Sequence, residues 1–315
     1  MLNSIYNATP LWESRALSAT LGAPVFLKME ALQPCGSFKA RGMEFACRAA
    51  RDAGAMRVVC ASGGNAGYAV AFTARRLALT ATIVVPQTTS PRAQDLIRGE
   101  DAELIVYGAS WDDAHAFALE RARDQRAAYI HPFDDPNVWR GHATMISEIA
   151  DAGIVPGAIV LSVGGGGLLC GVVEGMRALD WRDVPVIAVE TQGAASFAAA
   201  LRAGELVTLD RITSLATTLG ARRVAPRALE LARAHPIISH VVSDHAAVQA
   251  CLRFADDQRV LVEPACGAAL AAGYDRAAPL LKRAPIVFIV CGGAGVTRDL
   301  LEQWKSKAEN LPPDI

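Results

Sequence analysis

Short runs of apolar and β-branched residues alternate along this chain with longer alanine-rich segments. The short runs have the length of β-strands and the longer segments the length of helices, a pattern typical of a mostly parallel sheet covered by helices. One run, residues 158–163, lacks the alternation of a half-exposed strand, which predicts burial on both faces. We therefore predict an α/β protein with two open, twisted, mostly parallel sheets flanked by helices.

The same pattern predicts where the individual strands and helices lie in the sequence. Expected strands lie at residues 25–28, 57–61, 82–85, 103–106, 158–163, 186–190 and 286–290. Expected helices lie at residues 37–53, 65–77, 90–99, 111–126, 141–152, 167–179, 225–234, 244–256, 264–273 and 296–306. A chain of 315 residues suffices for two modest cores. We predict a large domain of residues 1–37 plus 141–315 and a small domain of residues 38–140.

Charge and cysteine content narrow the class of protein. The formal net charge is -1 without a block of like charges, which argues against nucleic-acid and membrane-surface partners. The first thirty residues lack a signal-peptide pattern, and no run reaches the roughly 18 apolar residues of a membrane span. Seven cysteines without paired spacing suit a reducing compartment, and none has zinc-site spacing. The expectation is a soluble cytoplasmic protein.

Glycine-rich turns follow several of the expected strands, at residues 62–67, 164–167 and 292–295. A fourth glycine-flanked segment, residues 36–42, surrounds a lysine at a helix start. Ligands of open α/β sheets collect at the carboxyl ends of strands, where helix N-termini also point. Four such segments at one site would require a cleft between two α/β units.

The turn Gly164-Gly165-Gly166-Gly167-Leu168 suits a phosphate, because four glycines free backbone N–H groups and the next helix adds its positive dipole end. It lacks the lysine and hydroxyl of a nucleotide P-loop and the GxGxxG register of a dinucleotide fold. A nucleotide-binding oxidoreductase is therefore disfavoured. The alternative is a glycine turn that serves only tight strand–helix packing.

Lys39 is predicted in the first turn of a helix, within Ser37-Phe38-Lys39-Ala40-Arg41-Gly42. A helix N-terminus and burial both lower a lysine pKa, which favours the neutral amine that forms a Schiff base. Phe38 could pack on a planar ring. The alternative, an ordinary solvated lysine, is the usual state of an isolated lysine.

Two further turns offer polar groups. In Ser62-Gly63-Gly64-Asn65-Ala66-Gly67, backbone N–H groups and Ser62 could hold a carboxylate, and Asn65 could donate to a phenolate oxygen. Either side chain could instead be an ordinary N-cap. Cys291, at the end of a strand, could face a ring nitrogen, or could be a buried apolar residue.

Together, SFKARG, SGGNAG, GGGGLLCG, VEPACGAALAA and VCGG resemble the catabolic serine dehydratase branch of the fold-type II, tryptophan-synthase-like pyridoxal-phosphate enzymes. The resemblance covers almost the whole chain, keeps the segment order, and includes FDDP at 133–136 and GHA at 141–143. It implies pyridoxal 5'-phosphate in the cleft between two domains, a small amino-acid substrate and a homodimer.

The resemblance also implies roles for individual residues. Lys39 would form the Schiff base and act with Ser62 as a catalytic residue, while Ser62, Gly63 and Asn65 would bind the substrate carboxylate. The other cofactor contacts would be Phe38 on one ring face, Asn65 at the ring hydroxyl, Cys291 at the ring nitrogen, and Gly164, Gly165, Gly166, Gly167 and Leu168 at the phosphate. A monovalent cation such as potassium would be bound by the Glu190 side chain and carbonyls near Gly164, Ala194, Leu219 and Ala221.

The expected reaction is β-elimination of L-serine to pyruvate and ammonia, and also of L-threonine to 2-oxobutanoate. Freed Lys39 would be the base for the Cα proton, and a thiol at the ring nitrogen would favour elimination over transamination. Cys35, Gly63 and Thr218 depart from the family pattern and bear on the preference between serine and threonine.

Alternatives on the same scaffold are a threonine deaminase, a serine racemase and a non-catalytic pyridoxal-phosphate-binding protein. Few residues follow Cys291-Gly292-Gly293, too few for the regulatory domain usual in biosynthetic threonine deaminases. Racemisation needs a second proton carrier, for which Thr218 is poorly suited. Retention of Lys39, Asn65 and the four glycines argues against a non-catalytic role.

Overall fold

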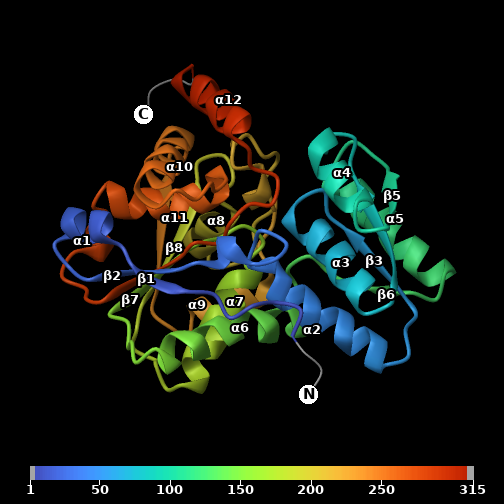
Figure 1. Ribbon diagram of the computed structural model, residues 1–315, viewed down its shortest axis with the longest axis horizontal. Helices are drawn as coiled ribbons and strands as arrows, with labels where there is room; N and C mark the ends of the chain where they lie inside the picture. The colour runs from blue at the N-terminus through green and yellow to red at the C-terminus, as the bar shows by residue number, and fades with distance from the viewer. Residues whose placement is uncertain (1–3, 311–315) are drawn as a thin grey trace.

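The computed structural model describes residues 4–310, and two sheets form its frame (Figure 1). The six-stranded sheet has the order β1-β2-β10-β7-β8-β9, and only β1 runs antiparallel to its neighbour. Its strands are β1 (Leu11–Glu13), β2 (Val25–Lys28), β7 (Ala158–Ser162), β8 (Val186–Thr191), β9 (Ile237–Val242) and β10 (Ile286–Ile289). The four-stranded sheet, order β5-β4-β3-β6, is entirely parallel. Its strands are β3 (Arg57–Ala61), β4 (Thr80–Val85), β5 (Glu103–Val106) and β6 (Ala128–Tyr129). The expected α/β architecture with two mostly parallel sheets is confirmed.

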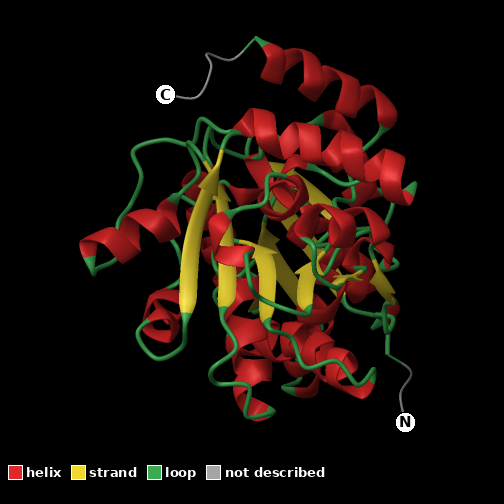
Figure 2. Ribbon diagram, turned by 90° about the vertical axis from the view of Figure 1, so that its left-hand side faces the viewer, coloured by secondary structure: helices red, strands yellow, loops and turns green. Residues whose placement is uncertain are grey.

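Helices cover both faces of each sheet (Figures 1 and 2). Around the six-stranded sheet lie α1 (Arg15–Leu21), α6 (Pro136–Asp151), α7 (Gly167–Ala178), α8 (Ser196–Ala203), α9 (Pro226–Ala232), α10 (Asp244–Gln258), α11 (Pro264–Tyr274) and α12 (Arg298–Glu309). Around the four-stranded sheet lie α2 (Lys39–Asp52), α3 (Asn65–Arg76), α4 (Pro91–Arg98) and α5 (Trp111–Asp124). The described part of the chain also contains three short 3-10 helices: η1 (Glu30–Leu32), η2 (Thr217–Leu219) and η3 (Ala278–Leu280).

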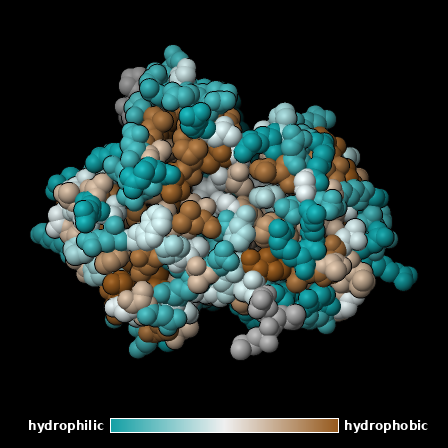
Figure 3. Space-filling view, in the orientation of Figure 1, coloured by the Kyte–Doolittle hydropathy of each residue, from teal (hydrophilic) through white to brown (hydrophobic). Residues whose placement is uncertain are grey.

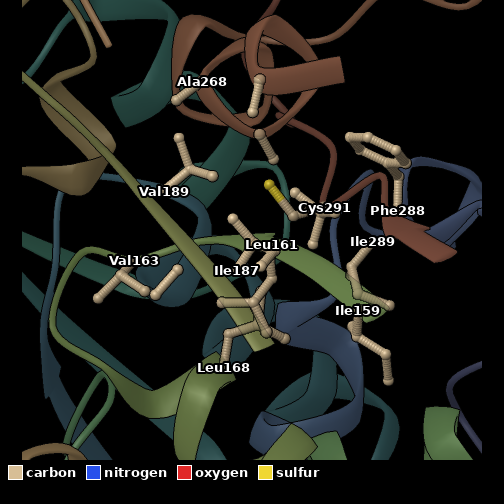
Figure 4. Packing of buried hydrophobic residues seen from close by; sticks show 14 of the residues in the cluster. Ile159, Leu161, Val163, Leu168, Ile187, Val189, Ala268, Phe288, Ile289 and Cys291 are labelled. Carbon is tan, nitrogen blue, oxygen red and sulfur yellow. The ribbon is translucent and has the colours of Figure 1, made fainter. Parts of the chain in front are cut away.

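Strand β3 shows why the covered parts of the central strands are largely apolar. Val58 and Cys60 belong to a core cluster shared with α2 and α3, whereas Val59 and Ala61 belong to a separate cluster with α5. Successive side chains of a strand point to opposite faces, so a strand covered on both sides has no polar face. The larger core, under α10 and α11, includes Cys291 at the end of β10 (Figure 4).

Several expected boundaries were wrong. The helix expected at 141–152 begins at Pro136, because the Asp135 side chain accepts from the Asn137 backbone N–H and Pro136 suits the first helical turn. The sequence pattern also missed β1, β6, β9, α1 and α8. Within residues 4–310, no helix is both long and apolar enough to cross a membrane.

Candidate active site

The segment before Lys39 is bonded to the turn after β10. Phe38 N donates to Cys291 O at 3.1 Å, and Gly293 N donates to Gly36 O at 2.9 Å. A Cβ at Gly292 would lie 2.3 Å from the Gly36 carbonyl oxygen, and Gly292 has a φ of 102°, so only glycine permits this approach. Two glycine-rich segments far apart in the sequence therefore lie side by side.

Lys39 is the first residue of α2, and its side chain is partly buried. Its Nζ donates to Pro132 O at 2.5 Å and lies 5.1 Å from the centre of the Phe38 ring. Burial lowers the pKa of Lys39 to about 8, partly offset by the nearby Cys60 and Cys291 thiols. A substantial fraction of neutral amine is therefore present near pH 8, unlike on a solvated surface lysine.

The four-glycine turn links β7 to the start of α7. A Cβ on Gly165 would lie 2.3 Å from the Phe133 ring, and one on Gly167 would lie 2.6 Å from the Phe133 carbonyl oxygen. Gly166, with a φ of 89°, precedes α7, and no side chain caps that helix. Tight packing and an uncapped helix N-terminus thus occur together, and the latter suits an anion such as a phosphate.

Asn65 begins α3 but does not cap it, and Ser62 Oγ accepts only from Gly64 N, at 3.3 Å. The N-cap alternative therefore does not apply to this helix. Asn65 Nδ2 instead donates to Glu263 Oε1 at 2.7 Å, and Asn65 Oδ1 accepts from Ala294 N at 2.9 Å. The side chain joins the four-stranded unit to loops of the six-stranded unit.

Glu263, which the sequence reasoning did not single out, lies beside these groups. Its side chain is buried, and Oε1 also accepts from Thr218 Oγ1 at 2.7 Å. Burial raises the pKa of Glu263 to about 7, although both hydrogen bonds lower it. The signal available in the sequence was a glutamate in VEPACG, directly before a helix.

Cys291 lies at the edge of the larger core, with 6% of its surface exposed. A hydrogen bond with Cys266 and burial raise the pKa of the Cys291 thiol well above its usual value. The group is therefore a neutral thiol at physiological pH.

The residues expected around a cation are partly brought together. Gly164 packs against the Leu219 backbone, and Ala221 N donates to Leu219 O at 2.7 Å. Glu190 is buried at the end of β8, where its two oxygens accept from the backbone N–H groups of Phe197 and Ala198 in α8, at 2.8 and 2.7 Å. Burial raises its pKa to about 7. Among the described residues, no cluster of three or more His, Cys, Asp or Glu side chains can hold a metal ion.

Comparison with known proteins shows which family has this sequence and fold. The family model described as "Pyridoxal-phosphate dependent enzyme" matches residues 2–292. The chain belongs to this family. A mouse "L-serine dehydratase/L-threonine deaminase" is 48% identical over 96% of this chain and 95% of the relative. A Dictyostelium discoideum "L-serine dehydratase" is 40% identical over 93% of this chain and 91% of the relative. The crystal structure of a fungal L-serine ammonia-lyase from Rhizomucor miehei has a TM-score of 0.91 and 39% identity, covering 97% of this chain and 100% of that one.

The residues fit the cofactor that the family name implies. The surface between the parts that carry α12 and α4 is indented, with apolar residues on its walls (Figure 3). Lys39 offers an amine of lowered pKa, and the glycine turn before α7 offers an uncapped helix N-terminus. A neutral thiol at Cys291 and the amide of Asn65 complete a donor set suited to a phosphorylated pyridine ring.

Proposed function

We propose that this pyridoxal-phosphate enzyme is an L-serine ammonia-lyase (L-serine dehydratase). The net reaction converts L-serine to pyruvate and ammonia, and L-threonine to 2-oxobutanoate and ammonia. The observation that carries the proposal is the Lys39 amine of lowered pKa, held beside Phe38 and the turn after Cys291. The serine dehydratases and serine ammonia-lyase that match over nearly the whole chain support this substrate class.

Pyridoxal phosphate, when bound, supplies electron withdrawal that makes the Cα proton of an amino acid acidic and lets the β-hydroxyl leave. Lys39 would hold the cofactor and then take the Cα proton on Nζ, a task suited to an amine with a pKa of about 8. A neutral Cys291 offers no negative charge to a ring nitrogen, which favours elimination over transamination.

The proposed binding residues lie in the turns after β3 and β7 and beside the start of α2. Gly164, Gly165, Gly166, Gly167 and Leu168 would hold the phosphate, with Phe38 and Asn65 at the ring. Ser62, Gly63 and Asn65 would orient the substrate carboxylate through N–H and hydroxyl donors, with Ser62 also serving in catalysis.

The decisive test is pyruvate formation from L-serine, followed by coupling to lactate dehydrogenase. Lys39→Ala should reduce turnover at least about 1000-fold, because the variant loses both the covalent anchor and the base. Lys307→Ala, an exposed lysine of α12, is the matched control and should match the unmodified enzyme. Undiminished pyruvate formation by Lys39→Ala would overturn the proposal. Chiral analysis of residual serine separates elimination from racemisation.

We propose potassium as the cation, bound by Glu190 with carbonyls near Gly164, Ala194, Leu219 and Ala221. Its test compares kcat/KM for L-serine in potassium and choline chloride at equal ionic strength. Potassium should raise activity in the unmodified enzyme and have little effect in Glu190→Gln. An equal potassium response in Glu190→Gln would contradict this ligand set.

The organisation beyond one chain is also a proposal. We propose a homodimer in which residues 1–37 plus 141–315 form the large domain and 38–140 the small one. Sedimentation equilibrium should give twice the chain mass. A cytoplasmic location is supported by seven cysteines that are all buried and free of disulfides.

A further inference from the structure

Glu263 is a buried carboxylate for which the reaction above assigns no role. It precedes α11, yet its side chain makes no cap hydrogen bond to that helix. Only 8% of its surface is exposed, and burial of a carboxylate without a cationic partner is costly. One oxygen, Oε1, accepts from both Asn65 Nδ2 and Thr218 Oγ1, each at 2.7 Å. The carboxylate thus serves two residues of other elements instead of its own helix.

These contacts determine which way the Asn65 amide faces. Its Nδ2 meets an acceptor on Glu263, and its Oδ1 meets a donor on Ala294, at 2.9 Å. A flipped amide would set oxygen against the carboxylate and N–H against the Ala294 N–H, which is doubly repulsive. An amide nitrogen carries two hydrogens, and Glu263 takes one. The second remains free to donate.

We propose that Glu263 is a positioning residue that acts through Asn65, holding the amide in the orientation that presents an N–H donor to the ring oxygen of pyridoxal phosphate. This inference rests on the cofactor site of the proposed function. Thr218 donates to the same oxygen and thereby helps to hold the carboxylate in place.

The charge on Glu263 changes in the neutral pH range, whereas its titratable neighbours do not titrate there. Its pKa is about 7 because of burial. The Cys251 and Cys291 thiols face it, from α10 and from the turn after β10, and both have pKa values well above their usual range. Asn65 of α3 and Thr218 of η2, on the remaining sides, carry no charge. Protonation of Glu263 would therefore change the acceptor that Asn65 faces.

The test measures the affinity of the apo-protein for pyridoxal phosphate by absorbance titration, and the visible cofactor band as a function of pH. Glu263→Leu should weaken affinity by about tenfold, because Asn65 loses the acceptor that fixes its amide. Glu263→Gln retains an acceptor oxygen and should remain within about threefold of the unmodified protein. Glu302→Leu, the same change at an exposed glutamate of α12, is the matched control and should also remain within about threefold.

The pH dependence of the visible band is a second readout that packing alone would not move. The unmodified protein should show a transition near neutral pH, and Glu263→Gln should lack it. Unchanged affinity in Glu263→Leu would overturn the inference. If circular dichroism shows that Glu263→Leu does not fold, the pH dependence of the visible band in Glu263→Gln decides the question. A band transition near neutral pH that persists in Glu263→Gln would overturn the inference.

Asn65→Ala separates this inference from the proposed function. Weaker cofactor binding in Asn65→Ala with unchanged binding in Glu263→Leu would leave the cofactor site standing and overturn only the role of Glu263. Unchanged binding in Asn65→Ala would overturn the assignment of Asn65 to the cofactor, and the inference with it. Pyruvate formation tests the reaction separately.

Discussion

At the scale of single residues, Gly165 shows how closely the four-glycine turn before α7 packs against its surroundings. Its Cα faces the Phe133 ring so directly that an added Cβ would lie 2.3–2.5 Å from three ring atoms. Phe133 N also donates to His131 Nδ1, and the Trp139 indole donates to Phe133 O at 2.7 Å. These bonds hold the Phe133 main chain, and its ring packs edge-on against His131 with ring centroids 4.6 Å apart. The absence of a side chain at Gly165 is therefore a structural requirement.

We expect Gly165→Ala to lower the free energy of unfolding by about 1–3 kcal/mol, as overpacking does in a filled core. The same change should weaken pyridoxal phosphate binding, because the loop must shift to relieve the clash. Urea denaturation and absorbance titration measure the two effects. Gly295→Ala is the control, since its added Cβ meets nothing within 4 Å. Equal stabilities of the two variants would contradict this account.

The raised pKa of Glu263 makes the stability of the folded protein depend on pH. Burial raises its pKa from 4.5 to about 7, so between these values the folded state keeps a proton that the unfolded state has lost. Stability therefore falls as pH rises through this window, and the full penalty persists above about pH 7.

Glu263→Gln removes this titration. Relative to the unmodified apo-protein, its free energy of unfolding should rise between pH 4.5 and pH 8 by up to about 3 kcal/mol. Urea denaturation at both pH values measures the difference. Glu302→Gln, an exposed position in α12, should show no such trend. A pH-independent difference for Glu263→Gln would show that the carboxylate is ionised throughout.

At the scale of elements, the local sequence pattern predicted the bounds of a helix or strand where the segment contains its own boundary residues. Strands β2, β3 and β5 match their expected bounds because each is a short run bounded by turn residues. Helix α8 was missed because its N-terminus has no side-chain cap of its own. Glu190, from β8, accepts from its first N–H groups instead. Strand β9, half-buried at the sheet edge and containing Ser239 and His240, also lacks a clear pattern.

Some residues of the candidate site could likewise be predicted from local sequence, and others could not. Glycine-rich turns are visible in sequence because close backbone approach requires glycine, and the segments around Gly36 and Gly292 do lie side by side. The contacts of Glu263 could not be predicted from local sequence pattern, because its partners Asn65 and Thr218 lie 198 and 45 positions away in the chain. A contact of that kind exists only once the two sheets are assembled.

Helix α2, which begins with Lys39, is held by a buried ion-pair network. Arg41 is fully buried and pairs with Glu30 at 2.8 Å and with Glu148 at 2.6 Å, while Lys28 also pairs with Glu148. Glu30 is itself completely buried. The network therefore ties the first turn of α2 to η1 and α6.

Arg41→Met should lower the free energy of unfolding by about 3–5 kcal/mol, because Glu30 would be left buried without its partner. Arg51→Met, in the same helix, removes only an exposed pair with Asp52 and should cost less than about 1 kcal/mol. Urea denaturation of both variants measures the contrast. Similar losses would mean that the buried network contributes no more than a surface pair.

At the scale of the whole molecule, the buried pair between Arg41 of α2 and Glu148 of α6 joins the four-stranded unit to the six-stranded unit, and contacts of several loops add to it. Asn65 reaches Glu263 and Ala294, Arg92 Nε donates to Gly295 O at 2.9 Å, and Arg222 pairs with Asp112 at 2.9 Å. The last two are solvent-exposed and contribute little to stability. The buried Arg41–Glu148 pair and the Asn65 bonds therefore hold the two units together, and a ligand bound between the units should add to this stability.

Pyridoxal phosphate that binds between the two units should stabilise the molecule as one unit. At a free concentration of about 100 times Kd, binding adds about 2.7 kcal/mol to the free energy of unfolding. Pyridoxal without phosphate should stabilise far less at the same concentration, because the glycine turn before α7 would have no anion to hold. Thermal unfolding of the apo-protein with each compound, followed by circular dichroism and tryptophan fluorescence, measures the effect. Equal shifts with both compounds would contradict the phosphate assignment. Transitions that separate between the two probes would show that the ligand stabilises only one of the units.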